Sequence, residues 1–186
     1  ARISVLLNDG TGAFLPRTDI YTNGAKSSTI KDLNGDGIED IAVASGDAAV
    51  SILKGKGDGT YFPRVSYVVG GGPWNVDFGD VDKDGNLDLV TANNGDDSFS
   101  VLQGYGNGTF GERIDYRSAN SPSRAQVRDV DGDTWPDILV SGTRNVAVSR
   151  NNQNGGFGTE VAIPAASPHS VVIGDFNSDG TMDLAT

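Results

Sequence analysis

The chain alternates short apolar runs with polar, glycine-rich turns, and the apolar runs follow the two-residue period of β-strands. One representative stretch contains four such segments, at residues 74–79, 87–92, 98–103 and 112–117. Nowhere does an apolar period of 3.6 residues persist for three turns, so the sequence does not support helices. The pattern therefore predicts an all-β fold of short antiparallel strands.

Two motifs recur in step along the chain. The first, DLNGDGIED and its variants, recurs at spacings of 48, 49 and 46 residues, over 32–40, 80–88, 129–137 and 175–183. The second is an alternating strand followed by a glycine-rich turn and an aromatic residue, over 3–14, 50–62, 99–110 and 146–157. Repetition of four strands per unit is typical of β-propeller blades, so we expect a propeller of four-stranded antiparallel blades.

The phase of the repeat predicts about four blades' worth of a single propeller domain or segment over residues 1–186. Residues 1–22 are expected to form a half blade of strands three and four, and residues 166–186 a half blade of strands one and two. Three whole blades are expected between them, over 23–70, 71–118 and 119–165. The two half blades are complementary. They are compatible with a closed four-blade ring, with part of a larger, seven-blade-type propeller, or with two chains paired into one larger ring.

The acidic motif has the spacing of a metal-binding loop, with side-chain oxygens at positions 1, 3, 5 and 9 and a backbone carbonyl at position 7. Alternate residues of an extended turn point the same way, so these oxygens converge, and calcium takes 6–8 hard oxygen ligands. We expect up to four Ca²⁺ ions, bound by the side chains of Asp32, Asn34, Asp36, Asp40; Asp80, Asp82, Asp84, Asp88; Asp129, Asp131, Asp133, Asp137; and Asp175, Asn177, Asp179, Asp183. The carbonyl ligands are expected from Ile38, Asn86, Trp135 and Thr181.

Two other interpretations of these loops compete with a calcium-bearing blade. Asp, Asn and Gly favour tight turns even without metal, but four copies in register favour metal binding. An EF-hand opens with the same letters but needs flanking helices and an acidic residue at position 12, where this chain has Val43, Thr91, Val140 and Thr186. Magnesium fits less well, because it prefers a smaller octahedral shell that keeps several waters. The third loop is expected to be the weakest, because Thr134 replaces the glycine of the other three.

Composition and charge support loops that hold cations. The 25 acidic residues give a net charge of −11, and 22 of them are Asp, which favours turns and hard-cation sites over helices. Four Ca²⁺ ions would bring the formal charge from −11 to −3. A nucleic-acid partner is not expected, because the 14 Lys and Arg form no visible basic face. Membrane insertion is not expected either, since no apolar run approaches about 18 residues.

The chain has no cysteine, so disulfides cannot hold its many loops together. Bound cations are the expected substitute, because closely spaced carboxylates repel one another until a cation neutralises them. Calcium at millimolar extracellular concentration suits loops of this kind. We therefore expect an extracellular, secreted or cell-surface protein.

These motifs resemble the FG-GAP/VCBS repeat family, which is related to the calcium-bearing blades of integrin α-subunit propellers. The Phe-Gly element is found at Phe110-Gly111 and Phe157-Gly158, and in weaker form at Phe14-Leu15 and Phe62-Pro63. A Gly/Ala-Pro element is matched by Gly72-Pro73, Ser121-Pro122 and Ser167-Pro168, with Gly24-Ala25 the departure. The resemblance implies a propeller, usually of seven blades, with calcium in the loop between strands one and two. Members of this family serve as adhesion modules, as lectins or as non-catalytic scaffolds within larger enzymes, so the resemblance implies one of these roles for this chain.

Candidate ligand-binding residues lie shortly before the acidic loops, at Lys26, Trp74, Arg124 and His169. An aromatic face there could stack on a sugar ring, but the simpler expectation is that Trp74 packs between blades and that Lys26 and His169 are solvated loop residues. Catalysis is not expected: His169 is the only histidine, and no nucleophile elbow is present. The sequence thus predicts a calcium-stabilised module that binds carbohydrate or protein. The alternatives are a structural unit that self-associates through open strand ends, and a non-catalytic scaffold of a polysaccharide-degrading enzyme.

Overall fold

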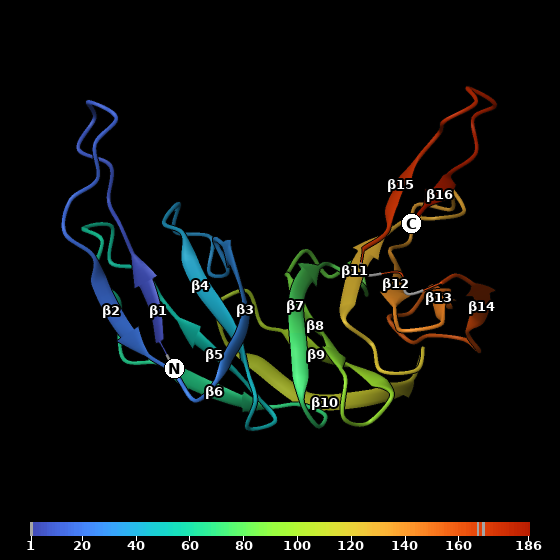
Figure 1. Cartoon of the computed structure of the whole chain (residues 1–186), viewed down its shortest axis with the longest axis horizontal. Helices are drawn as coiled ribbons and strands as arrows, with labels where there is room; N and C mark the ends of the chain where they lie inside the picture. Colours follow the sequence, from blue (N-terminus) through green and yellow to red (C-terminus); the bar gives the residue numbers. More distant parts are fainter. Residues whose placement is uncertain (1, 167, 169) are drawn as a thin grey trace.

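A computed structural model of the chain describes residues 2–166, 168 and 170–186. The described residues form sixteen strands in five antiparallel sheets (Figure 1). No helix of a length and hydropathy that could cross a bilayer occurs in these ranges. The prediction of an all-β fold made of propeller blades is confirmed, and the blades form an open arc.

Three sheets have four strands each, and each is a complete blade whose strands pair in chain order. Their strands are β3 (Ala25–Lys31), β4 (Asp40–Ser45), β5 (Ala49–Leu53), β6 (Val65–Val68); β7 (Pro73–Gly79), β8 (Asp88–Asn93), β9 (Ser98–Gly104), β10 (Phe110–Arg117); and β11 (Arg124–Arg128), β12 (Asp137–Ser141), β13 (Asn145–Ser149), β14 (Val161–Pro164). In the middle blade the observed strands agree with the predicted segments to within two residues at either end.

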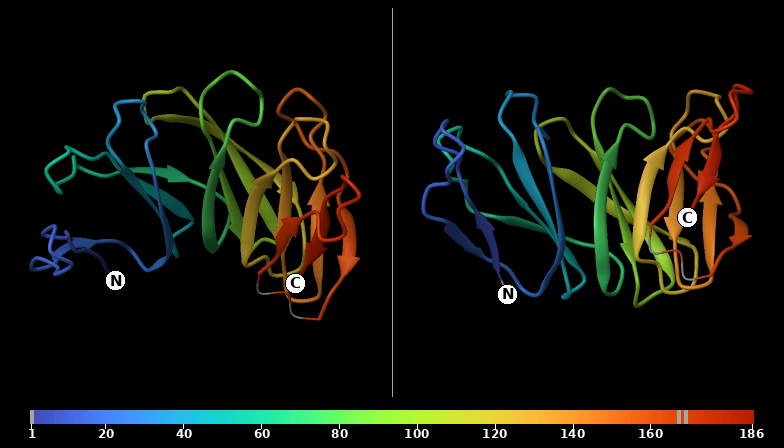
Figure 2. Two further views of the ribbon diagram at one scale, coloured as in Figure 1. Left: turned by 90° about the horizontal axis from the view of Figure 1, so that it is seen from above. Right: turned by 45° about the horizontal axis from the view of Figure 1, so that its top comes forward.

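A two-stranded sheet lies at each end of the arc. One consists of β1 (Arg2–Val5) and β2 (Thr18–Tyr21), and the other of β15 (Val172–Gly174) and β16 (Asp183–Ala185). The two sheets lie at opposite ends in every view and do not pair with each other (Figures 1 and 2). The closed four-blade ring considered from the sequence is therefore not the arrangement observed, because the rotation between successive blades is too small to bring the ends together in this number of steps.

Burial within each blade depends on the position of the strand. The second strands β4, β8 and β12 are buried along their whole length, since each lies between two strands of its own sheet and is covered by neighbouring blades on both faces. The fourth strands β6 and β14 are almost fully exposed. The first strands β3, β7 and β11 contact one another in sequence and line the inner side of the arc (Figure 1).

Aromatic side chains from the turns between third and fourth strands pack one blade against the blade before it. Phe157 of the third blade lies 5.7 Å from Phe99 and 5.3 Å from Tyr116 of the second, measured between ring centroids. Phe110 of the second blade likewise lies 5.3 Å from Tyr67 of the first. Edge-to-face contacts of this kind add roughly 0.5–1.5 kcal/mol to the burial of apolar area. Each turn therefore joins two consecutive blades.

In the first whole blade the aromatic residue at this position is Tyr61, whereas the sequence pattern had pointed to Phe62. Gly55 and Tyr61 form the bridge that Asn151 and Phe157 form in the third blade. Tyr61 packs against the buried cluster of Ile41, Val43 and Leu53, which apolar residues of β1 and β2 also contact, while Phe62 is 50% exposed. The sequence motif was misaligned by one residue because the turn register is set by backbone pairing, which the identity of the aromatic side chain does not reveal.

Replacing Phe157 by alanine tests this packing between blades. Phe157 is 9% exposed and contacts two rings of the preceding blade, so Phe157→Ala should lower the free energy of unfolding by about 3–5 kcal/mol. Phe62→Ala, at an exposed aromatic, should change it by less than about 0.5 kcal/mol. Urea unfolding followed by tryptophan fluorescence measures both variants, and equal losses would contradict the packing role.

Candidate metal centres and binding hollow

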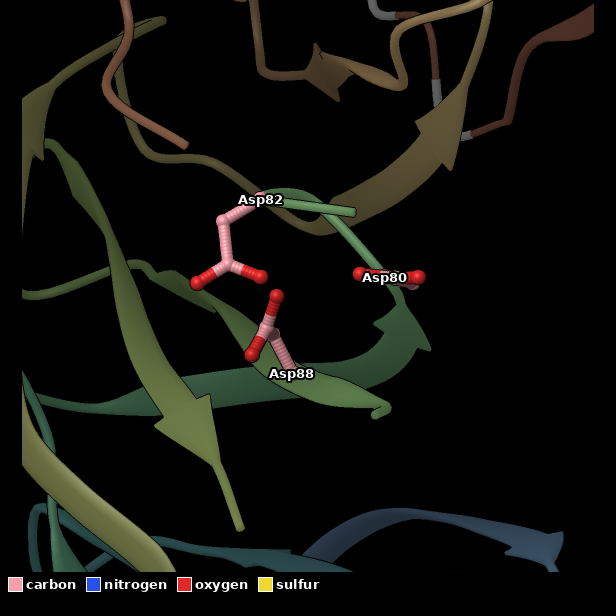
Figure 3. Close-up of side chains that lie close together, drawn as sticks. All are labelled: Asp80, Asp82 and Asp88. Carbon is pink, nitrogen blue, oxygen red and sulfur yellow. The ribbon is translucent and has the colours of Figure 1, made fainter. Parts of the chain in front are cut away.

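Each acidic loop connects the first strand of a sheet to the second. In the middle blade the loop leaves β7 at Asp80 and enters β8 at Asp88. The carboxylates of Asp80, Asp82 and Asp88 face a common point, with ligand atoms within 4.8 Å of one another (Figure 3). Three carboxylates this close repel strongly in the absence of a cation, so the arrangement can hold a metal ion.

The loop of the third blade repeats this geometry. Its carboxylates Asp129, Asp131 and Asp137 also lie within 4.8 Å of one another. Among the described residues these are the only two groups of three acidic or other strong ligands at that spacing. Both groups consist of hard oxygen donors from positions 1, 3 and 9, which fits a hard divalent cation.

The position-9 aspartate is the most buried member of each loop and connects two parts of the blade. Asp88 accepts hydrogen bonds from the backbone N–H of Val81, in the loop, and of Gly104, at the end of the third strand, each at 2.8 Å. The same pair of bonds is repeated in the first and third blades, at 2.8–3.1 Å, by Asp40 with Leu33 and Gly55 and by Asp137 with Val130 and Asn151. All three aspartates are at most 1% exposed. The loop spacing predicts that these aspartates bind metal, and it gives no signal of this second role.

Burial changes the protonation of two of these aspartates. It raises the pKa of Asp88 to about 6, against the opposing effect of the two backbone hydrogen bonds, and the charges of Asp82 and Asp84 raise it further. The pKa of Asp137 is raised as well, again mainly by burial. A cation beside these carboxylates would reverse the shift, because it stabilises the ionised form.

The position-1 aspartates are held by the backbone of their own loop. Asp32 accepts hydrogen bonds from the backbone N–H groups of four consecutive residues, 34–37, with that of Gly37 at 2.8 Å. These bonds, the one from Gly37 first, lower the pKa of Asp32. The N–H of Gly180 lowers the pKa of Asp175 in the same way. In the middle loop Asp80 accepts from Asp84 and Gly85, each at 3.0 Å. The position-1 carboxylate is thus oriented before any ion binds.

The position-5 aspartates accept a hydrogen bond within their own loop. Asp84 and Asp133 are not members of the two carboxylate groups, and each accepts the N–H of the residue at position 7 at 2.8 Å, as do their counterparts Asp36 and Asp179. The donors are the residues that were expected to supply carbonyl ligands: Ile38, Asn86, Trp135 and Thr181. These bonds leave further lone pairs on the carboxylates and leave the position-7 carbonyl oxygens free, so ligation by positions 5 and 7 stays a prediction.

In the first and fourth loops the structure does not bring three carboxylates together at this distance. Position 3 is asparagine in both, and the side-chain amides of Asn34 and Asn177 donate to Asp36 and Asp179, each at 2.9 Å. With one fewer acidic ligand, these loops have less charge to attract a cation. The two loops with asparagine at position 3 thus differ in charge from the two with aspartate there.

The third loop contains a strained residue. Thr134 has φ of 75°, a left-handed conformation that its glycine counterparts Gly37, Gly85 and Gly180 adopt without a Cβ penalty. Its hydroxyl accepts a hydrogen bond of 2.7 Å from Lys83 of the preceding loop, and the same ammonium lies 4.4 Å from the ring centroid of Trp135. Trp135 therefore helps to connect two neighbouring acidic loops.

Three of the four candidate ligand residues lie together on the inner strands. Trp74 and Arg124 line a hollow of about 370 Å³ between β3, β7 and β11, and Lys26 places its ammonium 5.3 Å from the centroid of the Trp74 ring. Trp74 is 45% exposed, so it is not packed away between blades. The hollow is also lined by Arg128, which the sequence analysis missed although it lies on the same strand as Arg124. His169 lies outside the described residues.

Replacing Asp88 tests the structural role of the position-9 carboxylate without metal. In chelator, Asp88→Ala should lower the free energy of unfolding by about 2 kcal/mol, because two buried N–H groups lose their acceptor at about 1–3 kcal/mol each while repulsion among the carboxylates is relieved. Asp84→Ala, in the same loop, removes one exposed turn bond and should cost clearly less. Urea unfolding compares them, and similar losses would show that Asp88 is not a structural connector.

Comparison with solved structures supports the propeller fold. The chain is 24% identical to an Agrocybe aegerita lectin whose structure concerns specific recognition of non-reducing terminal N-acetylglucosamine, with a TM-score of 0.59 over 88% of this chain and 46% of the lectin chain. It is 17% identical to a chain of the Photorhabdus luminescens Tc holotoxin pore, with a TM-score of 0.50 over 98% of this chain and 10% of that chain. The chain thus spans less than half the length of either. No curated protein matches it.

Comparison with protein families gives a more specific result. The family described as FG-GAP-like repeat matches three overlapping windows, residues 32–91, 80–140 and 129–186. Each window begins at position 1 of an acidic loop and extends through the next loop along the chain. Together the windows cover all three complete acidic-loop intervals and most of the sequence. The chain belongs to the FG-GAP-like repeat family.

Proposed function

We propose that the chain forms part of a calcium-stabilised, non-catalytic binding module that acts outside the cell and recognises carbohydrate or protein ligands. The observation that carries the proposal is the hollow on the inner strands, where the half-exposed ring of Trp74 lies beside the guanidinium-bearing Arg124. An exposed aromatic face next to hydrogen-bond donors is the combination that recognises a sugar ring or a planar side chain. Similarity to a lectin fold supports carbohydrate as the first ligand class to test.

Calcium is the cation that best fits the two carboxylate groups. Asp80, Asp82 and Asp88 supply hard oxygens, and loop carbonyls and water can raise the ligand number toward the 6–8 that calcium takes. The equivalent loop at 129–137 supplies the same set. The loops at 32–40 and 175–183, with asparagine at position 3, are proposed to bind calcium more weakly.

A non-catalytic role is supported by how the acidic residues are used. The position-9 carboxylates accept two backbone hydrogen bonds each, and the position-5 carboxylates close their own turns. Acid–base catalysis by a carboxyl pair requires groups that face a substrate pocket with well-separated pKa values. In the middle blade Asp82 and Asp88 line a hollow of about 240 Å³, but both belong to the group of three carboxylates, which is the arrangement of a cation site.

Calcium should stabilise the fold by mass action. At a free concentration one hundred times the dissociation constant, each occupied site adds about 2.7 kcal/mol to the free energy of unfolding. We expect the Tm to fall on chelation, to recover with Ca²⁺, and to recover less with Mg²⁺. The double variant Asp82→Asn/Asp131→Asn should lose most of this calcium-dependent shift, whereas Asp47→Asn, at an exposed turn, should keep it. A Tm that does not change on adding chelator would contradict the proposal that calcium stabilises the fold.

Acidification should reduce the effect of calcium. In the metal-free folded state the pKa of Asp88 is raised from 3.8 to about 6. This carboxyl therefore takes up a proton more readily in the folded than in the unfolded chain, and its protonation stabilises the metal-free folded state as pH falls from 7 through 6 toward 4. Calcium binding, in contrast, requires the carboxylate. The rise in Tm on adding Ca²⁺ should therefore be smaller at pH 5.5 than at pH 7.5, as measured by calorimetry at both pH values; an equal or larger rise at pH 5.5 would contradict the assignment of Asp88 as a ligand.

Ligand binding at the hollow is tested with a glycan array and titration calorimetry in millimolar calcium. Trp74→Ala should weaken binding of the best glycan at least about tenfold, equivalent to about 1.4 kcal/mol, because the stacking face is lost. Tyr21→Ala removes an exposed aromatic from β2, away from the hollow, and should leave binding unchanged. If no glycan binds to the folded, calcium-loaded protein, the carbohydrate assignment fails and a protein ligand is the remaining form of the proposal.

A further inference from the structure

The inner strands carry positive charge in a chain that is acidic overall. The whole chain has a net charge of −11, whereas the first strands β3, β7 and β11 together hold four basic residues and one acidic residue. The basic residues are Lys26, Lys31, Arg124 and Arg128, and the acidic residue is Asp77. Most of the acidic residues lie instead in the loops that follow the first strands. The inner side of the arc is therefore locally cationic (Figure 1).

Three of these cations lie at the hollow and have no carboxylate partner. Arg124 and Arg128 line the hollow, and the ammonium of Lys26 lies beside it, over the ring of Trp74. In the part of the chain that the structure describes, every ion pair involves other basic residues. The guanidinium of Arg124 donates to the hydroxyl of Ser170 at 3.4 Å, and that of Arg128 donates to the backbone carbonyl of the residue before it at 2.6 Å. Both acceptors are neutral, so they leave the positive charge uncompensated.

The one carboxylate that lines the hollow serves to join two strands. Asp77 accepts the N–H of Val127 at 3.2 Å, and Asn75 of the same strand accepts the N–H of Ala125 at 2.9 Å. These bonds connect β7 to the edge of β11 that does not pair with β12. Since three cations face this single carboxylate, the hollow keeps an excess of positive charge.

The hollow is formed entirely by the three whole blades. Its lining residues lie on β3, β7 and β11, except for Ser123, which directly precedes β11. The blades of a closed propeller surround a central channel, and the first strands occupy the inner side of the arc (Figure 1). This surface therefore faces the channel whether or not further blades extend the arc.

Neutral hydroxyl groups complete the lining of the hollow, from Ser27, Ser28, Thr29 and Ser123. A hydroxyl group both donates and accepts hydrogen bonds, as the hydroxyls of a sugar do. A guanidinium offers a planar fork of donors that matches the two oxygens of a carboxylate or a similar oxyanion. With the half-exposed ring of Trp74, the hollow thus combines an aromatic face, hydroxyls and uncompensated cations.

We propose that the hollow binds an acidic sugar, one that carries a carboxylate or sulfate group. The inference rests on the proposed function, because it names the ligand class of the same hollow. Arg124 and Arg128 pair with the anionic group, and Lys26 adds positive charge beside the ring of Trp74. A concave site with an excess of one charge attracts the opposite charge, even on a molecule whose net charge is −11.

A glycan array of matched pairs, followed by titration calorimetry in millimolar calcium, tests the proposal. One set of pairs consists of uronate oligosaccharides and their methyl esters, and the other of sulfated oligosaccharides and their desulfated forms. The acidic member of the best pair should bind at least about tenfold more tightly than the neutral one, and the set to which it belongs identifies the anion. Raising the NaCl concentration from about 0.05 M to about 0.5 M should weaken binding of the acidic member only. Equal affinity of both members would overturn this inference and leave the proposed carbohydrate function intact, whereas no binding by any glycan would overturn both.

Two arginine pairs locate the anion. Arg124→Gln/Arg128→Gln should bring the ratio of the two affinities close to one. Arg64→Gln/Arg144→Gln, at exposed arginines outside the hollow, makes the same change in net charge and should leave the ratio unchanged. All four side chains belong to exposed residues, so both variants should fold, as the Tm checks. Equal effects of the two double variants would overturn the assignment of the hollow.

A third variant excludes direct binding of the anion to calcium in the acidic loops. Asp82→Asn/Asp131→Asn removes one carboxylate from each of the two carboxylate groups and leaves the hollow intact. Measured below its Tm, this variant should keep the preference for the acidic sugar. Loss of the preference in this variant would show that a loop cation, not the arginine pair, holds the anion, and would overturn the proposal.

Discussion

The structure depends on a buried carboxylate at the start of the second strand of each blade. Asp40, Asp88 and Asp137 each accept one N–H from the acidic loop and one from the end of the third strand, so one side chain fixes the loop, the second strand and the third strand together. Burying an ionised group is costly unless hydrogen bonds or a counter-charge compensate. The two N–H groups supply part of that compensation, and a cation or a proton supplies the rest.

This constraint links the fold to the metal chemistry. Where positions 1 and 3 are also acidic, the buried carboxylate becomes the third member of a cluster of like charges. Burial, and to a smaller extent the charges of Asp82 and Asp84, raises the pKa of Asp88. A divalent cation relieves the repulsion and orders the loop in the same step. A small repeat unit with no disulfide can in this way hold a nine-residue loop in one conformation.

Packing between blades follows a separate rule. The second and third whole blades each contribute one aromatic residue to the blade before them, and the fully buried second strands add to the core. Because every contact is between neighbours, the arc can be extended at either end without changing its interior. The same property leaves Phe14 and Leu6 exposed at one end, and it brings the inner strands together around the hollow that contains Trp74 and Arg124.

The amino-acid sequence determined the blade, the strand segments and the location of the acidic loops. These features depend on local periodicity, turn residues and repeated spacing, all of which can be read along the chain. It did not determine which oxygens meet. Hydrogen bonds inside each loop orient the side chains: Asp84 and Asp133 accept the N–H at position 7, and Asn34 and Asn177 donate to neighbouring aspartates, and none of these bonds follows from the spacing of the motif.

Only the tertiary structure decided features that depend on contacts between distant residues. It placed Tyr61 rather than Phe62 against the buried cluster of Ile41, Val43 and Leu53, since pairing with Gly55 sets the turn register. It left the arc open, because the angle between blades results from side-chain packing across the whole interface. It also gathered Lys26, Trp74 and Arg124, each from a different blade, since only the side-by-side packing of first strands brings residues about 50 positions apart to one surface.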